Sequence, residues 1–105
     1  MKKLYIDDMR RPPDESFVLV KDTAEAIEWV CLNGCPDIIS FDYCLAHGKN
    51  VMPFVLWLIE QDKKAPFFPP NFRFDVHSSS SFGCAEINRV LGSYLDLRSR
   101  PPVAL

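Results

Sequence analysis

The sequence lacks an excess of positive charge and a long apolar run. It carries 12 basic and 14 acidic residues, a net charge of −2, so a broad cationic surface for duplex DNA is not expected. No apolar run reaches the roughly 18 residues that span a bilayer. An acid pair, Asp7 and Asp8, follows the first lysines too early for a secretory signal. These absences predict a cytoplasmic domain that has neither duplex DNA nor a membrane as its partner.

The sequence is also poor in metal-binding cysteine and histidine patterns. The spacing Cys31-x-x-x-Cys35 differs from the C-x-x-C spacing of common zinc sites, and His47 and His77 form no H-x-x-x-H pair. Because the cytosol keeps thiols reduced, a disulfide framework is not expected either. We therefore expect the four cysteines to be buried or incidental thiols.

The length and composition indicate one globular domain. A chain of 105 residues is too short for two independent cores. Hydrophobic residues make up 48% and charged residues 25% of it, which is typical of soluble globular proteins and excludes extensive disorder. We assign residues 1–98 to a single domain and residues 99–105 to a C-terminal tail.

Short apolar runs alternate with helical patterns along the chain. Runs that are apolar on both faces, such as residues 38–41, are typical of parallel strands covered by helices on each side. The first crossover is unusual, because Pro12 and Pro13 stand where a helix is expected. The pattern predicts a small three-layer α/β domain with about four mainly parallel strands and three helices. The expected strands are residues 4–6, 17–20, 38–41 and 72–76, and the expected helices are residues 22–34, 53–62 and 81–94.

Polar side chains follow three of the four predicted strands. Asp7 and Asp8 follow the first strand, Asp42 the third, and His77 and Ser78 the fourth. Because ligands bind at the carboxyl edge of a parallel sheet, we expect these side chains to form one site. The alternatives are that the acid pair only caps a turn and that His77 is a structural histidine. Asp42 needs a partner or water, since an unpaired buried acid is costly.

A run of serines follows the last predicted strand. One serine of the run caps the last helix, and the others line a turn whose backbone N–H groups can bind an anion. We predict that Ser78, Ser79 and Ser80 bind phosphate together with Arg11, whose guanidinium can pair with two phosphate oxygens. Alternatively, Arg10 and Arg11 only neutralise the nearby acid pair as surface ion pairs.

At these residues the chain resembles the cyclic-phosphate-processing receiver-like domains. These are short relatives of the response-regulator receiver (flavodoxin-like) fold and occur in bacteria and phages. The resemblance extends from Leu4 to about Leu95. The motifs that carry it are Leu4–Pro13, Ser40–Asp42, and Val76–Ser78 followed by Gly83 and Ile87.

The chain departs from the family pattern at three places. Tyr43-Cys44 replaces a His-Asp pair, Ser80-Ser81 replaces Asn-Pro, and Glu86 replaces an asparagine. The missing His-Asp pair removes an acid/base or metal-binding element. The resemblance is therefore to a degenerate member of the family.

The resemblance implies that the domain hydrolyses or only binds a cyclic phosphate on a nucleotide or an RNA end. We predict His77 as the acid/base, because an ordinary imidazole titrates near neutrality, with Asp42 and Ser78 as the other catalytic residues. Asp7, Asp8 and Asp42 are predicted to hold Mg²⁺, which prefers oxygen ligands, or to orient His77. Whether the chain is a phosphoesterase is left open.

Three other functions compete with hydrolysis. In the first, the domain is a phosphorelay receiver in which Asp42 is phosphorylated, although no fifth strand ends in the lysine that receivers use. In the second, a degenerate domain binds a phosphate ligand or a protein without turnover, as an inhibitor would. In the third, the domain is an interaction module whose exposed aromatic segment, residues 67–70, contacts a protein partner.

Overall fold

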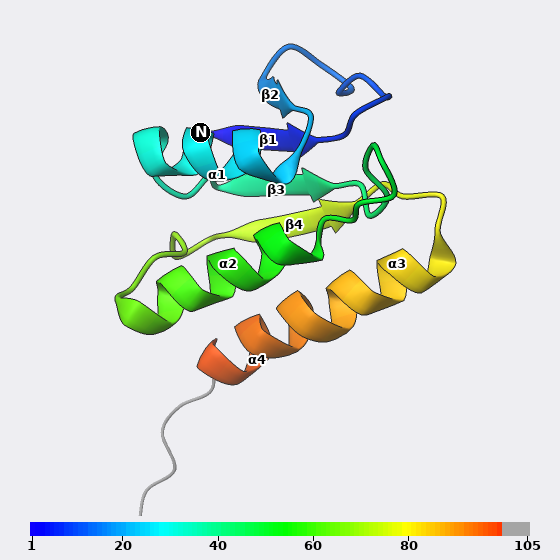
Figure 1. Cartoon of the computed structure of the whole chain (residues 1–105). Helices are drawn as coiled ribbons and strands as arrows, with labels where there is room; N and C mark the ends of the chain where they lie inside the picture. Colours follow the sequence, from blue (N-terminus) through cyan, green and yellow to red (C-terminus); the bar gives the residue numbers. More distant parts are fainter. Residues whose placement is uncertain (100–105) are drawn as a thin grey trace, which may run out of the picture.

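The computed structural model describes residues 1–99, so residues 100–105 of the predicted tail lie outside the described part (Figure 1). Within residues 1–99, no helix is both long and apolar enough to cross a membrane. The C-terminal helix is continuous from residue 81 to residue 99 and contains a π-helical segment, η1, between α3 and α4. The elements are β1 (Lys3–Ile6), β2 (Phe17–Val20), α1 (Thr23–Asn33), β3 (Ile38–Phe41), α2 (Met52–Lys64), β4 (Arg73–Val76), α3 (Ser81–Ile87), η1 (Asn88–Gly92) and α4 (Ser93–Ser99).

The four strands form one parallel sheet in the order β2-β1-β3-β4. Ile6 of β1 pairs with Val20 and with Phe41, and Phe41 pairs with Val76. All four strands therefore end at the same edge, which places the residues that follow them side by side. The predicted fold class, with four parallel strands and three helical segments, is confirmed.

The helices pack on one face of the sheet. Alternate strand residues, including Ile6, Ile39 and Phe41, are fully buried in a core shared with α2 and the C-terminal helix. The opposite face carries Tyr5 and Ser40, which lie outside that core.

The loop between β1 and β2 lies against this second face. Arg11 and Pro13 of the loop line a groove there together with Tyr5 and Ser40. Among residues 1–99 the third layer is thus a loop, and the predicted helices on both sides are corrected to helices on one. The cause is local, because Pro12 and Pro13 prevent a helix in the first crossover.

Helix α1 begins as its sequence predicts. The carboxylate of Asp22 accepts the backbone N–H of Glu25 at 2.8 Å, and the carboxylate of Glu25 accepts the N–H of Lys21 at 2.8 Å. The first bond satisfies an amide group that the first turn leaves free, and the second satisfies the amide of the residue before the N-cap. Gly34 ends the helix with a φ of 83°, a conformation that glycine adopts without strain.

The aromatic segment of residues 67–70 is not the exposed surface that the interaction-module hypothesis requires. Phe68 is 6% exposed and belongs to the core, and Phe67 is half-buried. The backbone N–H groups of both phenylalanines donate to Asp62 at the end of α2, at 3.0 and 3.2 Å. The segment therefore connects α2 to the rest of the core.

Asp62 is a structural carboxylate, and its replacement is expected to make stability less dependent on pH. It also accepts bonds from Tyr94 and Arg98 at 2.7 Å, and its side chain is 4% exposed. Burial alone raises the pKa of Asp62, but Tyr94, the two phenylalanine amides and Arg98 together hold this pKa below its usual value. Asp62 therefore stabilises the fold above about pH 4, and this contribution is lost as the pH falls through the folded-state pKa.

The test is urea unfolding of Asp62→Asn and of the matched surface variant Glu60→Gln. Asp62→Asn is expected to lower the free energy of unfolding by about 1–2 kcal/mol at pH 7, whereas Glu60→Gln should change it by less than about 0.5 kcal/mol. The difference between the wild-type protein and Asp62→Asn should shrink below about pH 4. An equal difference at pH 7 and pH 3 would show that the charge of Asp62 is not what stabilises the fold.

Candidate functional site

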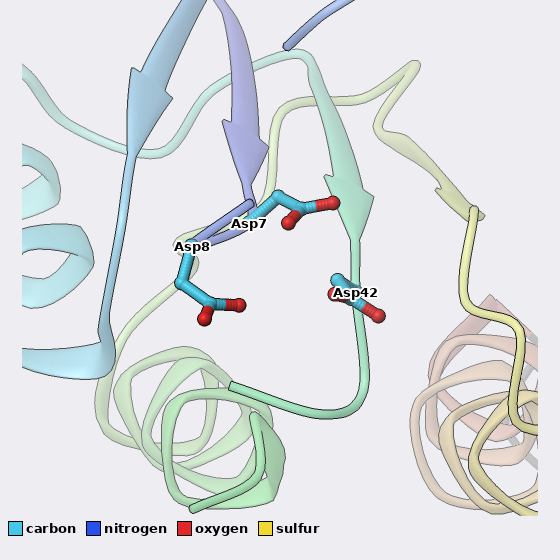
Figure 2. Close-up of side chains that lie close together, drawn as sticks. All are labelled: Asp7, Asp8 and Asp42. Carbon is cyan, nitrogen blue, oxygen red and sulfur yellow. The ribbon is translucent and has the colours of Figure 1, made fainter. Parts of the chain in front are cut away.

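Three acidic residues meet where β1 and β3 end. Asp7 and Asp8 follow β1, Asp42 follows β3, and one carboxylate oxygen of each lies within 4.8 Å of the others (Figure 2). Asp7 is 1% exposed, and Asp8 and Asp42 are half-buried. The carboxyl edge of the sheet thus brings together acids that are far apart in the sequence.

The carboxylate of Asp7 is already engaged on both oxygens. Oδ1 accepts the backbone N–H groups of Met9 and Arg10 at 2.8 and 2.9 Å, and Oδ2 lies 2.9 Å from Nε2 of His77. Burial alone raises the pKa of Asp7, but the amides of Arg10 and Met9 and the bond to His77 hold it below its usual value. Asp7 is therefore an ionised residue that both caps the turn and binds the imidazole.

His77 is held on both ring nitrogens and on one ring face. Nδ1 lies 2.7 Å from Oγ of Ser40, Nε2 binds Asp7, and the ring stacks on Tyr5 with centroids 4.1 Å apart and an angle of 6°. A carboxylate only accepts hydrogen bonds, so a neutral ring carries its proton on Nε2. Nδ1 is then the acceptor, and the hydroxyl of Ser40 donates to it.

The sequence prediction gave no catalytic or binding role to Ser40, a motif residue, or to Arg10, which was expected at most to neutralise the acid pair. Ser40 is the one polar residue of strand β3 and is 5% exposed, so the need of a buried hydroxyl for a partner was the available signal. The guanidinium of Arg10, rather than that of its neighbour Arg11, donates to the backbone carbonyl of His77. No sequence signal distinguishes the two arginines, because only the turn after β1 decides their directions.

Asp42 and Ser78 follow the neighbouring strands β3 and β4 at the carboxyl edge. Burial and the neighbouring Asp7 raise the pKa of Asp42, while a hydrogen bond from the side chain of Ser78, followed by His77 and Arg10, acts in the opposite direction. Asp42 therefore lies within electrostatic reach of His77 and Ser78 at this edge. Their catalytic roles stay predictions.

The serine turn is largely occupied by its own hydrogen bonds. Oγ of Ser78 accepts the N–H of Ser80 at 3.1 Å, and Oγ of Ser80 accepts the N–H of Gly83 at 3.0 Å. Ser80 is therefore the N-cap of α3, and Ser79 is exposed.

Arg11 lies apart from the serine turn. It lines the groove on the second face of the sheet, a space of about 490 Å³ that also has Tyr5, Ser40 and His77 in its walls. Ser78, Ser79 and Ser80 do not line this groove. The predicted phosphate-binding set is thus divided, because Arg11 lines this groove with His77 and the three serines do not.

Among residues 1–99, the side chains of Tyr43 and Cys44, which replace the His-Asp pair of the family, make no hydrogen bond to the acids of the carboxyl edge. Tyr43 packs against Phe82 with ring centroids 6.0 Å apart and covers Gly83. Cys44 is exposed, and its backbone bridges to Asn50. Tyr43 therefore contributes packing at a position where the family has an acid/base residue.

The cysteines form no disulfide among the described residues, and all four thiols are free. Burial, followed by the nearby acids Asp37 and Asp62, raises the pKa of Cys35 to about 12, so its reactive thiolate form is suppressed. Within residues 1–99, the acidic cluster at the carboxyl edge is the one group with metal-binding geometry, and it contains no cysteine.

Comparison with known proteins places the chain in a family. A family model described as the cyclic-phosphate processing receiver domain matches residues 2–93. The matched range contains all four strands and every site residue described above, from Asp7 to Ser80. Comparisons with curated proteins and with solved structures gave no match. Because the family model covers most of the sequence, the chain belongs to the cyclic-phosphate processing receiver domain family.

Proposed function

We propose that this domain binds a cyclic phosphate of a nucleotide or an RNA end at the carboxyl edge of the sheet and opens the phosphate ring by hydrolysis. The observation that supports this most is the position of His77, which lies between Asp7 and Ser40 beside the acidic cluster. Ring opening has two needs. The first is a group that transfers protons, and the second is positive charge near the phosphoryl oxygens. The imidazole meets the first need, and Arg11, which lines the groove beside His77, would meet the second.

The acidic cluster fits a magnesium ion. Three carboxylates with oxygens within 4.8 Å of one another are the oxygen-rich donor set that Mg²⁺ prefers. Burial and the charge of Asp7 both disfavour the ionised form of Asp42, and a cation would relieve that cost. Because both oxygens of Asp7 are engaged, Asp8 and Asp42 would be the direct ligands. A bound Mg²⁺ would supply positive charge for the phosphoryl oxygens.

The protein groups of the site divide the remaining work. Asp7 orients the imidazole of His77 and stabilises the charged ring when it holds a second proton. Arg11, which lines the same groove as His77, would pair with phosphoryl oxygens through its guanidinium. The side chain of Ser78 lowers the pKa of Asp42, and it would orient this metal ligand by donating a hydrogen bond to it.

A second candidate function is binding without turnover. Tyr43 packs against Gly83 and Cys44 is exposed, so the positions of the family's His-Asp pair give no second acid/base. A domain of this kind would retain a phosphate ligand or act as an inhibitor. A phosphorelay role for Asp42 has less support, since the sheet described for residues 1–99 has four strands and lacks the fifth strand that carries the receiver lysine.

The experiment is a panel of cyclic phosphates measured for both binding and turnover. The panel contains a nucleoside 2′,3′-cyclic phosphate, a 3′,5′-cyclic mononucleotide, a cyclic dinucleotide and an RNA with a cyclic-phosphate end, each with Mg²⁺ and with a chelator. Calorimetry measures binding, and ³¹P NMR measures ring opening. His77→Gln is compared with His47→Asn, which changes the other, exposed histidine to a residue that tolerates its φ of 62°.

We expect turnover of at least one panel member and a loss of about 10²–10⁴-fold in His77→Gln, with His47→Asn unchanged. The chelator is expected to lower turnover, because it removes the positive charge beside Asp8 and Asp42. Binding without turnover would select the second candidate function. The absence of both would contradict a cyclic-phosphate function for this chain.

A further inference from the structure

We propose that Ser40 is a nucleophile activated by His77 and Asp7, and that ring opening passes through a covalent phosphodiester on its Oγ. The use of Ser40 in ring opening rests on the proposed function, whereas its activation rests on geometry alone. Ser40, His77 and Asp7 form a continuous hydrogen-bonded chain, with contacts of 2.7 and 2.9 Å. A serine, histidine and aspartate in this order are the parts of a nucleophilic relay, which is recognised by geometry rather than by fold.

The direction of the hydrogen bonds is the one that activation requires. The carboxylate of Asp7 takes the proton of Nε2, so the lone pair of Nδ1 faces the hydroxyl of Ser40. The proton of Ser40 therefore points at the base that would remove it. A water molecule would have to displace this hydroxyl before it could use the same base.

The relay is held rigidly. Ser40 lies within β3, in register with Tyr5 of β1 and Asp75 of β4. The ring of His77 stacks on Tyr5, and its backbone carbonyl accepts a bond from Arg10. Asp7 is fixed by two backbone amides. A nucleophile whose base cannot rotate away loses little entropy in reaching the reactive geometry.

Ser40 also has access to a space that suits an anion. It lines the groove of about 490 Å³ on the second face of the sheet, together with His77 and a set of charged residues. Three cations and one acid surround the groove, namely Lys3, Arg11, Arg73 and Asp75. This excess of positive charge stands out in a chain whose net charge is −2, and it complements a phosphodiester anion.

The proposed reaction has two steps, and water is the only reactant it needs besides the cyclic phosphate. In the first, Oγ of Ser40 attacks phosphorus, the proton of Ser40 passes to Nδ1 of His77, and the ring P–O bond breaks as its oxygen takes that proton. In the second, water attacks phosphorus and gives a proton to Nδ1, the P–Oγ bond breaks, and Oγ recovers the proton. The net reaction adds one water to the cyclic phosphate. A single histidine thus serves both steps, although the family's second histidine is absent.

The test uses a fluorophosphonate probe on the whole chain, with the attached site read by mass spectrometry. The probe loses fluoride when a serine oxygen attacks its phosphorus, so a stable adduct reports the nucleophile. Cleavage after Lys21 and Lys49 gives a peptide in which Ser40 is the one serine, which makes the assignment direct. The variants are Ser40→Ala, Ser40→Cys and His77→Gln, with Ser93→Ala as the control for an exposed serine. Thermal unfolding followed by circular dichroism checks that each variant is folded.

We expect one adduct per chain at Ser40, with a labelling rate at least about 100-fold lower in Ser40→Ala and His77→Gln and unchanged in Ser93→Ala. Ser40→Cys, which keeps a nucleophile, should be labelled at position 40. Ring opening that continues at the wild-type rate in folded Ser40→Ala would overturn the proposal and leave the hydrolase function intact. Labelling at Ser40 without turnover of any cyclic phosphate would support the activated serine and contradict the proposed function. Absence of an adduct at Ser40 would overturn the activated serine.

Discussion

Gly83→Ala is expected to lower the free energy of unfolding by about 3 kcal/mol. The sign is opposite to the ordinary result, because alanine in place of glycine inside a helix usually stabilises it by about 1 kcal/mol. A Cβ at position 83 would lie 2.3 Å from Cγ and 2.4 Å from Cβ of Tyr43, which is far inside van der Waals contact. Cβ of Tyr43 is tied to its backbone, so the clash cannot be relieved by rotating the tip of a flexible side chain. Urea unfolding measures the loss.

Gly92→Ala is the matched control for this substitution. Gly92 lies in the same continuous C-terminal helix, but its added Cβ would be 3.8 Å from the ring of Phe74, an ordinary contact. Gly92→Ala should therefore be neutral or stabilising by up to about 1 kcal/mol. The double variant Gly83→Ala/Tyr43→Ala should lose less free energy of unfolding than the two single variants lose together, since Tyr43→Ala removes the clash. Wild-type stability in Gly83→Ala would mean that Tyr43 does not cover α3.

Asp7→Asn is expected to reduce ring opening and the labelling of Ser40 by about 10³–10⁴-fold while the fold is kept. An asparagine retains an oxygen for the amides of Met9 and Arg10, so the turn after β1 can still form. Its amide no longer requires the proton of His77 to be on Nε2, and it cannot stabilise the charged ring. In serine proteases the same change at the corresponding acid lowers the rate by about 10⁴-fold, because the imidazole takes the wrong tautomer.

Labelling kinetics with the fluorophosphonate probe measure this effect even before a substrate is known. The comparison is with Asp14→Asn, which changes an exposed aspartate of the following loop whose carboxylate accepts the backbone N–H of Ser16. A thermal unfolding curve shows whether Asp7→Asn is folded. Labelling at the wild-type rate in a folded Asp7→Asn protein would mean that Asp7 only caps the turn.

The sequence was sufficient to predict the sheet and the edge where the acids meet. Short runs ending in Asp8, Asp42 or His77 indicate parallel strands, and the carboxyl ends of parallel strands lie at one edge. The cap at Asp22 was also predictable, because its side chain and that of Glu25 act within a single turn. These features depend on local patterns and on a general rule of sheet topology.

The relay could not be predicted in the same way. Ser40 and His77 are 37 positions apart, and their contact depends on the register in which Ser40 pairs with Asp75 of β4. The prediction of helices on the second face of the sheet was wrong because burial of a strand residue does not show which kind of element covers it. Tyr5 and Ile38 are buried, which favours a covering helix, but the groove beside them is walled by a proline loop and by charged side chains.

The position of the proton on the ring of His77, on Nε2 or on Nδ1, tests most directly the claim that Ser40, His77 and Asp7 form a relay. Long-range ¹H–¹⁵N correlation NMR distinguishes a protonated ring nitrogen from one with a free lone pair, and it is recorded at a pH where the ring is neutral. The predicted result is a proton on Nε2 and a lone pair on Nδ1 in the wild-type protein, with loss of this preference in Asp7→Asn. A proton on Nδ1, or a ring that averages between the two tautomers in the wild-type protein, would contradict the relay from Ser40 through His77 to Asp7.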